Sequence, residues 1–358
     1  MPFYYDIDEK GAAGRRTADG LLTLRNALAA EVPARTLNDT LLLGTWNIRE
    51  FDSEAYGDRL DESFYYIAEI ISHFDLVAVQ EIREDLKALK KLTRILGSRW
   101  RYVVTDVTEG KPGNRERLGF LYDSRKVRFS GLAGELVIPP KKRKGPNGET
   151  IYDPSNQLYR TPFSVGFTAG WFKFILTTVH MVYGKDKADD PKRVEEIKLV
   201  AEFLKKRATG GSSWSSNLIA LGDFNIFSPE DVTMKQLTNA GFVVPQALQE
   251  VPATNVGKKK RHYDQIAFRL AENRLAFGNA GVFDFFQHVF RDDQRDVYKQ
   301  AMGKAFHTSS KGKKRDEAGK TSYYRTYWRT HQMSDHLLMW VELGVDFGEE
   351  YLKGKAGG

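Results

Sequence analysis

The sequence predicts one large α/β domain in which β-sheets pack together and helices lie outside them. Short apolar segments alternate along the chain with segments that have helical spacing. Several of the apolar segments are apolar on both faces, as is typical of strands buried between two layers. No linker divides the 358 residues into two balanced halves. All these elements are therefore expected to share one core.

The expected strands are short and rich in apolar and β-branched residues. They cover residues 41–48, 75–82, 101–107, 117–123, 174–181, 217–224, 263–268 and 336–343.

Helical signals fall between these strands. Asp190-Pro191 is typical of an N-cap followed by proline at the first helical position, and the periodic run continues to about residue 206. Ser228 indicates a second start, for a helix through residue 237, with Asp231 placed to complete a capping box. Helical spacing also occurs in residues 15–32, 59–72 and 84–96.

The domain boundaries follow from these elements. Residues 1–40 are expected to form an N-terminal extension that is partly helical, and residues 346–358 a C-terminal tail. The domain between them, 41–345, is expected to carry an insertion at about 280–330, which is helical over about 284–302.

The composition excludes several kinds of chemistry. The chain has no cysteine, which excludes disulfides, thiolate zinc sites and cysteine nucleophiles and fits a reducing compartment. The N-terminus, MPFYYDIDEK, has no basic region followed by an apolar one, so no signal peptide is evident. No apolar run approaches the roughly 20 residues needed to span a bilayer. We therefore expect a soluble cytoplasmic protein without a membrane partner.

The net charge of +7 is concentrated in three stretches. Residues 141–148 and 258–261 carry four positive charges each, and residues 311–320 carry five positive and two negative charges. Basic loops on an otherwise mildly acidic chain indicate a polyanionic partner. Lysine-rich loops also keep proteins soluble, and for each single run this alternative stays open.

Polar residues repeatedly stand where an apolar strand meets a loop. These are Asn47, Glu81, His180, Asp223, Asn225, Asp264, Asp335 and His336. A rigid sheet positions a catalytic constellation at one edge in this way. Each residue alone has a structural explanation, since Asp and Asn are ordinary turn formers; the whole series in this order indicates a site.

Seven motifs in this series resemble those of the endonuclease/exonuclease/phosphatase superfamily, nearest to its deoxyribonuclease I-like nuclease branch. They are TWNIR (45–49), VAVQEIR (77–83), RERLGFLYD (115–123), TTVH (177–180), LGDFN (221–225), YDQIAF (263–268) and SDH (334–336). The resemblance implies a four-layer α/β/β/α sandwich of two packed, mostly antiparallel sheets. It makes residues 41–345 the expected catalytic domain.

The resemblance also implies a metal site for Mg²⁺ or Mn²⁺. Glu81 is the expected ligand, with Asn47 and Asp335 nearby, and all three offer the oxygen atoms that magnesium prefers. Asp223 and Asn225 are expected to face the scissile phosphate, where they would hold the attacking water, bind a second metal or orient the nucleophile.

Two histidine–carboxylate pairs follow from the same resemblance. His336 is expected to act as general base or as a donor to the phosphate, with Asp264 fixing its tautomer. His180 is expected to protonate the leaving oxygen, paired with Glu116.

The resemblance implies two phosphate contacts as well. Arg83 and Arg160 match the phosphate-contacting arginines of the superfamily, and guanidinium geometry suits bidentate binding.

These residues favour a nuclease that hydrolyses phosphodiester bonds, of DNA rather than RNA, by in-line attack of water. The basic loops would contact the phosphate backbone. Abasic-site endonucleases typically have tyrosine in place of the second histidine, and the inositol phosphatase branch has a cysteine-containing signature around Asp264 that is missing here. The alternative is a phosphodiesterase or phosphatase acting on a phospholipid, as sphingomyelinases do, or on a small phosphate ester. Endonuclease or exonuclease mode and oligomeric state stay open.

Overall fold

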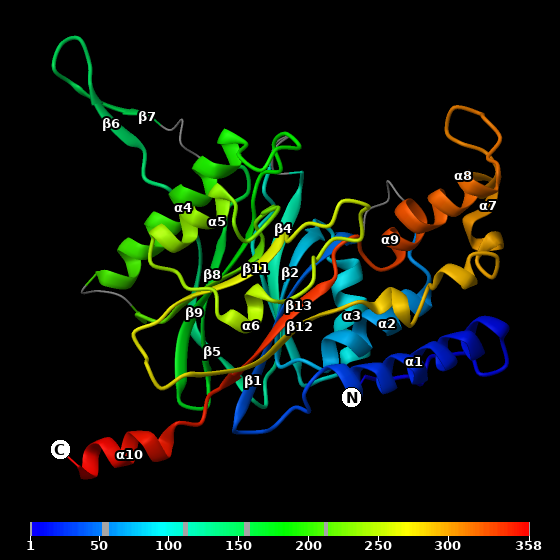
Figure 1. Ribbon diagram of the computed structural model, residues 1–358, viewed down its shortest axis with the longest axis horizontal. Coiled ribbons are helices and arrows are strands. Elements are labelled where there is room, and N and C mark those ends of the chain that lie inside the picture. Colours follow the sequence, from blue (N-terminus) through cyan, green and yellow to red (C-terminus); the bar gives the residue numbers. More distant parts are fainter. Residues whose placement is uncertain (1, 52–56, 110–113, 154–157, 211–213, 358) are drawn as a thin grey trace.

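Two β-sheets form the centre of the protein in a computed structural model that describes residues 2–51, 57–109, 114–153, 158–210 and 214–357 (Figure 1). The larger sheet has the strand order β12-β13-β1-β2-β4-β3. Its strands are β1 (Thr40–Phe51), β2 (Leu76–Arg83), β3 (Trp100–Val104), β4 (Glu116–Asp123), β12 (Ala276–Phe283) and β13 (Leu338–Gly344).

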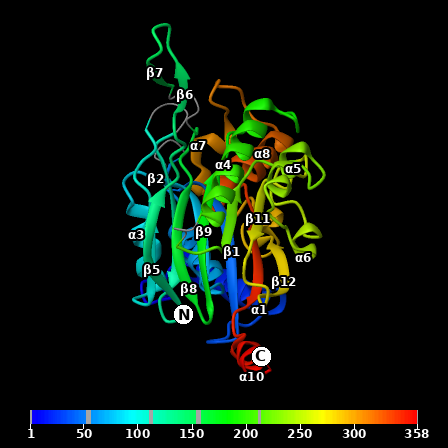
Figure 2. The same ribbon diagram turned by 90° about the vertical axis from the view of Figure 1, so that its left-hand side faces the viewer.

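The second sheet has five strands in the order β11-β10-β9-β8-β5. They are β5 (Val127–Glu135), β8 (Phe163–Ala169), β9 (Phe172–His180), β10 (Leu218–Asp223) and β11 (Asp264–Arg269). A separate two-stranded hairpin, β6 (Lys141–Lys144) and β7 (Thr150–Asp153), extends from the same end of the molecule as α7 (Figure 2).

Each sheet contains one parallel pair, β1 with β2 and β9 with β10, and all its other pairs are antiparallel. A crossover helix joins each parallel pair, α2 (Asp61–Ser72) in the first sheet and α4 (Pro191–Thr209) in the second. Parallel strands need such a crossover, whereas antiparallel neighbours can be joined by tight turns. The prediction of two mostly antiparallel sheets is confirmed.

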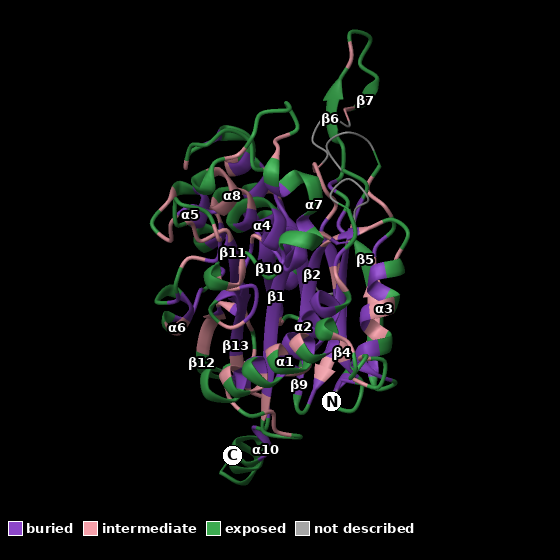
Figure 3. Ribbon diagram, turned by 90° about the vertical axis from the view of Figure 1, so that its right-hand side faces the viewer, coloured by how far each residue is buried: buried purple, intermediate pink, exposed green. Residues whose placement is uncertain are grey.

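The layers follow from the alternation of side chains along the strands. Leu41 and Leu43 of β1 face the core between the sheets, whereas Leu42 and Trp46 face the helices. That helical layer consists of α1 (Ala12–Glu31), α2 and α3 (Lys87–Leu96), while α4 and α5 (Val232–Asn239) cover the five-stranded sheet. The strands at the centre are buried and the β6–β7 hairpin is exposed (Figure 3). The result is the expected α/β/β/α sandwich.

Two helix starts test the predicted caps. Asp190 is the N-cap of α4, and its carboxylate accepts hydrogen bonds from the backbone N–H groups of Lys192 and Arg193, as predicted. The predicted start at Ser228 was wrong, because α5 begins at Val232 with Asp231 as its N-cap. The Asp231 carboxylate accepts from the Ser228 N–H at 2.9 Å, so these two residues close a turn before the helix.

The predicted helix over 284–302 was also wrong in its first part. The Asp284 carboxylate accepts from the N–H of Phe286 and starts a short 3₁₀ turn, η2 (Phe285–Gln287). Phe290 then takes a left-handed φ of 49°, which no continuous helix tolerates. After a second 3₁₀ turn, η3 (Asp292–Gln294), the first α-helix of this segment is α7 (Lys299–His307).

The chain continues through α8 (Glu317–Tyr323), the π-helical turn η4 (Tyr324–Trp328) and α9 (Arg329–Gln332) before β13. Buried Phe285, Phe290 and Tyr324 belong to the core cluster that lies under α1 and α2. The segment is therefore anchored in the helical layer. Two further helices are α6 (Gln246–Gln249) and α10 (Gly348–Ala356). Within the described ranges, every helix falls short of the length and apolarity that a bilayer crossing requires.

Candidate active site

Three neighbouring strands of the five-stranded sheet bring three predicted site residues side by side. Asp223 at the end of β10 is the register partner of both His180 on β9 and Asp264 on β11. Gly222 precedes Asp223 with φ 128°, and a Cβ atom there would lie 2.3 Å from the carbonyl oxygen of Val179. Glycine therefore permits the close approach of β9 and β10 that aligns the three side chains.

The six-stranded sheet contributes Asn47 from β1, Glu81 from β2 and Glu116 from the start of β4. Glu81 has a left-handed φ of 62°, and the pairing of β2 with β4 shifts register between Val79 and Ile82. A β-bulge of this kind redirects a side chain and is common beside active sites. It holds the Glu81 carboxylate where it accepts from the Asn47 amide at 2.9 Å and from the Glu50 N–H at 2.7 Å.

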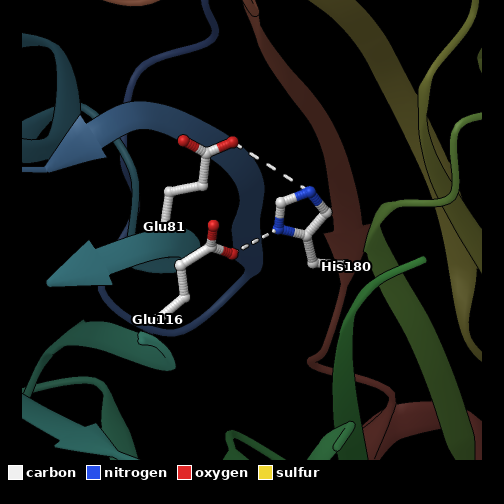
Figure 4. Close-up of side chains that lie close together, drawn as sticks. All are labelled: Glu81, Glu116 and His180. Carbon is white, nitrogen blue, oxygen red and sulfur yellow. Dashed lines mark ion pairs between the residues drawn. The ribbon is translucent and has the colours of Figure 1, made fainter. Parts of the chain in front are cut away.

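Both predicted histidines direct Nε2 toward one oxygen of Asp223. Nε2 of His180 lies 3.5 Å and Nε2 of His336 lies 3.8 Å from Asp223 Oδ2. On its other side, His336 Nδ1 is 2.8 Å from Oδ2 of fully buried Asp264. His180 Nδ1 is 3.0 Å from Oε2 of Glu116, which makes the two an ion pair (Figure 4). The ring N–H does not point along this contact and so forms no hydrogen bond with the carboxylate.

The electrostatic environment favours protonated histidines. Burial alone lowers the pKa of His336, but Asp264 and Asp223 more than offset this and raise it well above its usual value. For His180, burial and Arg160 lower the pKa, while Glu116 and Asp223 raise it, and the net direction is upward. Nδ1 of each ring faces a carboxylate, which leaves Nε2 as the atom that can exchange a proton with a ligand.

Glu81 is the carboxylate best suited to a divalent cation. Ligand atoms of Glu81, Glu116 and His180 lie within 4.8 Å of one another. Glu116, however, already accepts from Arg160 at 2.8 Å and from Asn114 at 2.6 Å. Burial raises the pKa of Glu116, but His180 and Arg160 lower it to a net value of about 2. For Glu81, burial and the negative charges of Glu116 and Asp335 raise the pKa, which a bound cation would reverse.

Asn47 provides an independent test of the fit to a metal. Its Nδ2 donates to Glu81 at 2.9 Å and to Asp223 at 3.2 Å, which fixes the orientation of the amide. Its buried Oδ1 has no hydrogen-bond partner among the described residues. An unpaired carbonyl oxygen beside carboxylates suits a hard cation such as Mg²⁺. Asp335 contributes a carboxylate that is 45% exposed and 3.9 Å from Arg49.

The two predicted arginines converge on Glu116. Arg160 Nε donates to its Oε2 at 2.8 Å, and Arg83 Nη1 lies 3.9 Å from its Oε1. Arg83 also donates to the Asn114 carbonyl oxygen at 2.8 Å and pairs with Glu50 at 3.4 Å. Both side chains are mostly buried beside the site; their expected contact with phosphate stays a prediction.

Ser334 ties the last motif to β1. Its hydroxyl donates to the carbonyl oxygen of Asn47 at 2.6 Å and accepts from the N–H groups of Arg49 and His336 at 3.1 Å each. The Trp46 indole donates to the His336 carbonyl oxygen at 2.9 Å. Asn225 has φ 53°; its side-chain amide donates to the Met181 carbonyl oxygen at 2.8 Å and its backbone N–H donates to Asp223 Oδ1 at 2.9 Å, so it holds the ends of β9 and β10 together.

Several residues around the site escaped prediction from the sequence. Gln80 donates to Thr45 on β1 at 3.2 Å and to Thr178 on β9 at 2.8 Å, and so bridges the two sheets below the site. Tyr263 packs against the His336 ring with centroids 5.6 Å apart. The position of Gln80 directly after the apolar run 76–79 and directly before Glu81 was the signal that could have identified it.

The three basic stretches have different settings. Residues 141–148 form most of the exposed β6–β7 hairpin. The loop with 258–261 borders the site, since Val256 N–H donates to the Asp335 carbonyl oxygen, while Lys259 and Arg261 pair with Asp186. Residues 311–320 lead into and begin α8.

Comparisons with known proteins agree on the fold. No family model matches the sequence. A protein of Thioalkalivibrio sp. named deoxyribonuclease is 27% identical over 264 residues, which cover 71% of this chain and 64% of that protein. The mannosyl-6-phosphatase structure of Bacteroides thetaiotaomicron has a TM-score of 0.53 at 18% identity and covers 85% of this chain and 99% of its own.

An endonuclease/exonuclease/phosphatase family protein, also from Bacteroides thetaiotaomicron, has a TM-score of 0.52 at 17% identity and covers 86% of this chain and 98% of its own. The chain thus has the fold of the endonuclease/exonuclease/phosphatase superfamily.

Proposed function

We propose that the protein is a metal-dependent nuclease that hydrolyses phosphodiester bonds, DNA being the preferred substrate. The observation that supports this best is the pair of carboxylate-backed histidines whose Nε2 atoms both face Asp223 Oδ2. Hydrolysis of a phosphodiester needs proton acceptance at the attacking water and proton donation to the leaving oxygen. Two separately backed histidines provide two proton-exchanging groups in one site.

Each group has a distinct task in this proposal. Asp223 orients the attacking water in line with the phosphorus and accepts the proton that the water loses. His336, held at Nδ1 by Asp264, contacts the phosphate through Nε2. His180, beside Glu116, protonates the departing oxygen. Arg83 and Arg160 lie next to the His180–Glu116 pair. When substrate binds, phosphate oxygens replace part of the contact of these two arginines with Glu116.

Mg²⁺ or Mn²⁺ would be held by Glu81, with Asn47 Oδ1 and Asp335 as further oxygen ligands. Bound there, the ion neutralises charge that develops on the phosphate and on the leaving oxygen. The carboxylate-rich surroundings of Glu81 and the unpaired Asn47 oxygen support this assignment.

Two features support nucleic acid as the substrate. The relative from Thioalkalivibrio is named deoxyribonuclease. The β6 strand of the exposed hairpin consists entirely of the basic residues KKRK, which suit a phosphate backbone. The alternative is a phospholipid or small phosphate ester, as the name of the mannosyl-6-phosphatase illustrates for a protein with the same fold.

One panel of substrates tests the proposal. Plasmid DNA, RNA, sphingomyelin and a sugar phosphate are incubated with Mg²⁺, with Mn²⁺ and with excess chelator. We expect metal-dependent cleavage of DNA, which is lost in Glu81→Ala and His336→Ala but retained in the matched control His288→Ala, whose ring stacks on Phe283 beside α1. Full activity in chelator or in His336→Ala would disprove the mechanism, and cleavage of the sugar phosphate alone would select the alternative.

A further inference from the structure

A hollow of about 790 Å³ lies between α7, α8 and the π-helical turn η4. Its lining combines aromatic rings, hydroxyl groups and positive charges, among them Tyr323, Tyr327, Thr326, Ser309, Arg315 and Lys304. Figure 1 shows these elements together at one side of the molecule, next to the chain that leads through α9 into β13. None of the steps of the proposed hydrolysis uses this hollow.

The π-helical turn separates two pairs of aromatic rings. Tyr324 and Trp328 stack at 5.9 Å and are buried in the helical-layer core. Tyr323 and Tyr327 stack at 5.4 Å with an angle of 23° between their planes, and Tyr327 stays 41% exposed. The buried pair anchors the segment; Tyr323 also packs against this core, whereas Tyr327 lies outside it. Short π-helical segments are rare and are often found at functional sites.

Positive charge surrounds the outer ring pair. The Arg315 guanidinium lies 4.7 Å from the centroid of the Tyr323 ring, and Lys304 lines the same hollow. The nearby Glu317 carboxylate pairs with Arg295 at 3.0 Å and with Lys320 at 2.6 Å, so it does not neutralise Arg315. Stacked rings flanked by cations are typical of surfaces that bind single-stranded nucleic acid.

Arg49 connects the hollow to the candidate metal site. Its guanidinium carbon lies 5.6 Å from the centroid of the Tyr327 ring, and its Nε lies 3.9 Å from Asp335 Oδ2. It also donates to the Thr330 hydroxyl at 2.6 Å. Arg49 therefore lies between Tyr327, which lines the hollow, and Asp335. A nucleotide that flanks the scissile phosphate can extend along Arg49 into the hollow.

We propose that this hollow is a nucleotide subsite, in which an unpaired base extends the Tyr323–Tyr327 stack at the exposed Tyr327 ring while its phosphate contacts Arg315 and Lys304. The proposal rests on the proposed nuclease function and deepens it. A base inside the hollow cannot remain paired in a duplex, so the preferred substrate is a single strand or a locally unpaired end.

The test compares two substrates in the double variant Tyr323→Ala/Tyr327→Ala. A short single-stranded DNA offers a base to the hollow, whereas bis(p-nitrophenyl) phosphate offers a phosphodiester without one. We expect kcat/KM for the oligonucleotide to fall about tenfold or more relative to kcat/KM for the small diester, mainly through KM, as loss of base stacking requires. The single variant Tyr327→Phe keeps the ring and leaves Tyr323 unchanged. Its ratio of the two kcat/KM values should therefore stay close to that of the wild type.

Tyr351→Ala is the matched control. Tyr351 is similarly exposed (37%) and its ring contacts that of Trp171, but it belongs to α10, at the opposite end of the molecule. Its two kcat/KM values should keep the wild-type ratio. An equal loss on both substrates in the double variant, or wild-type cleavage of duplex DNA as efficient as of the same single strand, would overturn the subsite.

A binding measurement separates failure of the subsite from failure of the proposed nuclease function. A single strand that contains 2-aminopurine is titrated in chelator, and its fluorescence is expected to be quenched by the wild-type protein and not by the double variant. If the wild type hydrolyses neither substrate, the nuclease function is refuted and this titration alone decides the subsite. Absence of quenching by the wild type overturns the subsite even in an active nuclease.

Discussion

Asp264→Asn removes one negative charge from the site while it keeps the size of the side chain. Asp264 is fully buried on β11, and its Oδ2 lies 2.8 Å from His336 Nδ1. Its own N–H donates to the Thr254 hydroxyl at 3.1 Å, a contact that asparagine retains. The substitution therefore isolates the electrostatic support of His336 from the packing of the strand.

The magnitude follows from the geometry. Charges on an imidazolium and a carboxylate in this contact are centred about 4 Å apart, and at an effective dielectric constant of about 20 they interact by about 4 kcal/mol. If this support is realised mostly in the transition state, its loss lowers kcat by about 10²- to 10³-fold. Burial lowers the pKa of His336, and the negative charge of Asp264 raises it. In Asp264→Asn the pKa of His336 should therefore fall as well.

Initial rates of cleavage of a labelled oligonucleotide in Mg²⁺, measured from about pH 5.5 to about pH 9, test both effects. The limb of the pH–rate profile that reports His336 is expected to move to lower pH in Asp264→Asn. Asp346→Asn, beyond the end of β13, serves as the control, and thermal unfolding verifies that both variants fold. A rate within about threefold of wild type with an unshifted profile would refute the assigned role of Asp264.

Three further predictions concern the metal, the core and the hairpin. Mg²⁺ at about 100 times its dissociation constant should stabilise the protein by about 2.7 kcal/mol in calorimetry, and Glu81→Gln should abolish this; equal stabilisation of the variant would exclude Glu81 as the ligand. Burial raises the pKa of Asp123, but hydrogen bonds from Arg125 and Arg35 hold it well below its usual range. This carboxylate therefore stabilises the fold above about pH 4 and loses the effect as the pH falls through its folded pKa. Asp123→Asn should lower the free energy of unfolding by about 3 kcal/mol at neutral pH and by less near pH 3, and a pH-independent difference in urea titrations would contradict this. Alanine substitution of the four basic residues Lys141–Lys144 should reduce the slope of log affinity against log salt by up to about 3, whereas an unchanged slope would place the hairpin outside the DNA interface.

The buried strands were predictable because their sequence signal is strong. β1, β2, β10 and β11 lie within three residues of their predicted bounds at either end, since each contains an unbroken apolar run that is buried. β5 was missed, because it is largely exposed and therefore lacks an apolar signature. β8 was missed although its buried residues Phe163, Val165 and Phe167 alternate with the small residues Ser164, Gly166 and Thr168, a period-two signal that the sequence does contain.

The sequence named residues that the structure brings together in the candidate site, but it did not predict their geometry. Asn47, Glu81, His180, Asp223 and His336 could be named because chemistry-bearing residues stand at the ends of apolar strands. The left-handed bulge that directs Glu81 and the position of Asp223 between two rings depend on contacts between residues far apart in the chain. Such contacts are set by the packing of one sheet on the other, which short motifs do not encode.

The order of strands has a consequence for the synthesis of the protein. β13 follows Asp335 and His336 and is the last of the described strands, yet it inserts between β12 and β1, which is the first of them. Until β13 has emerged, β1 lacks a neighbour on one side, and the site lacks a proposed metal ligand and a proton-exchanging group. A nascent chain that carried the proposed activity would therefore be unable to cut nucleic acid, including the message being translated, until β13 had been translated.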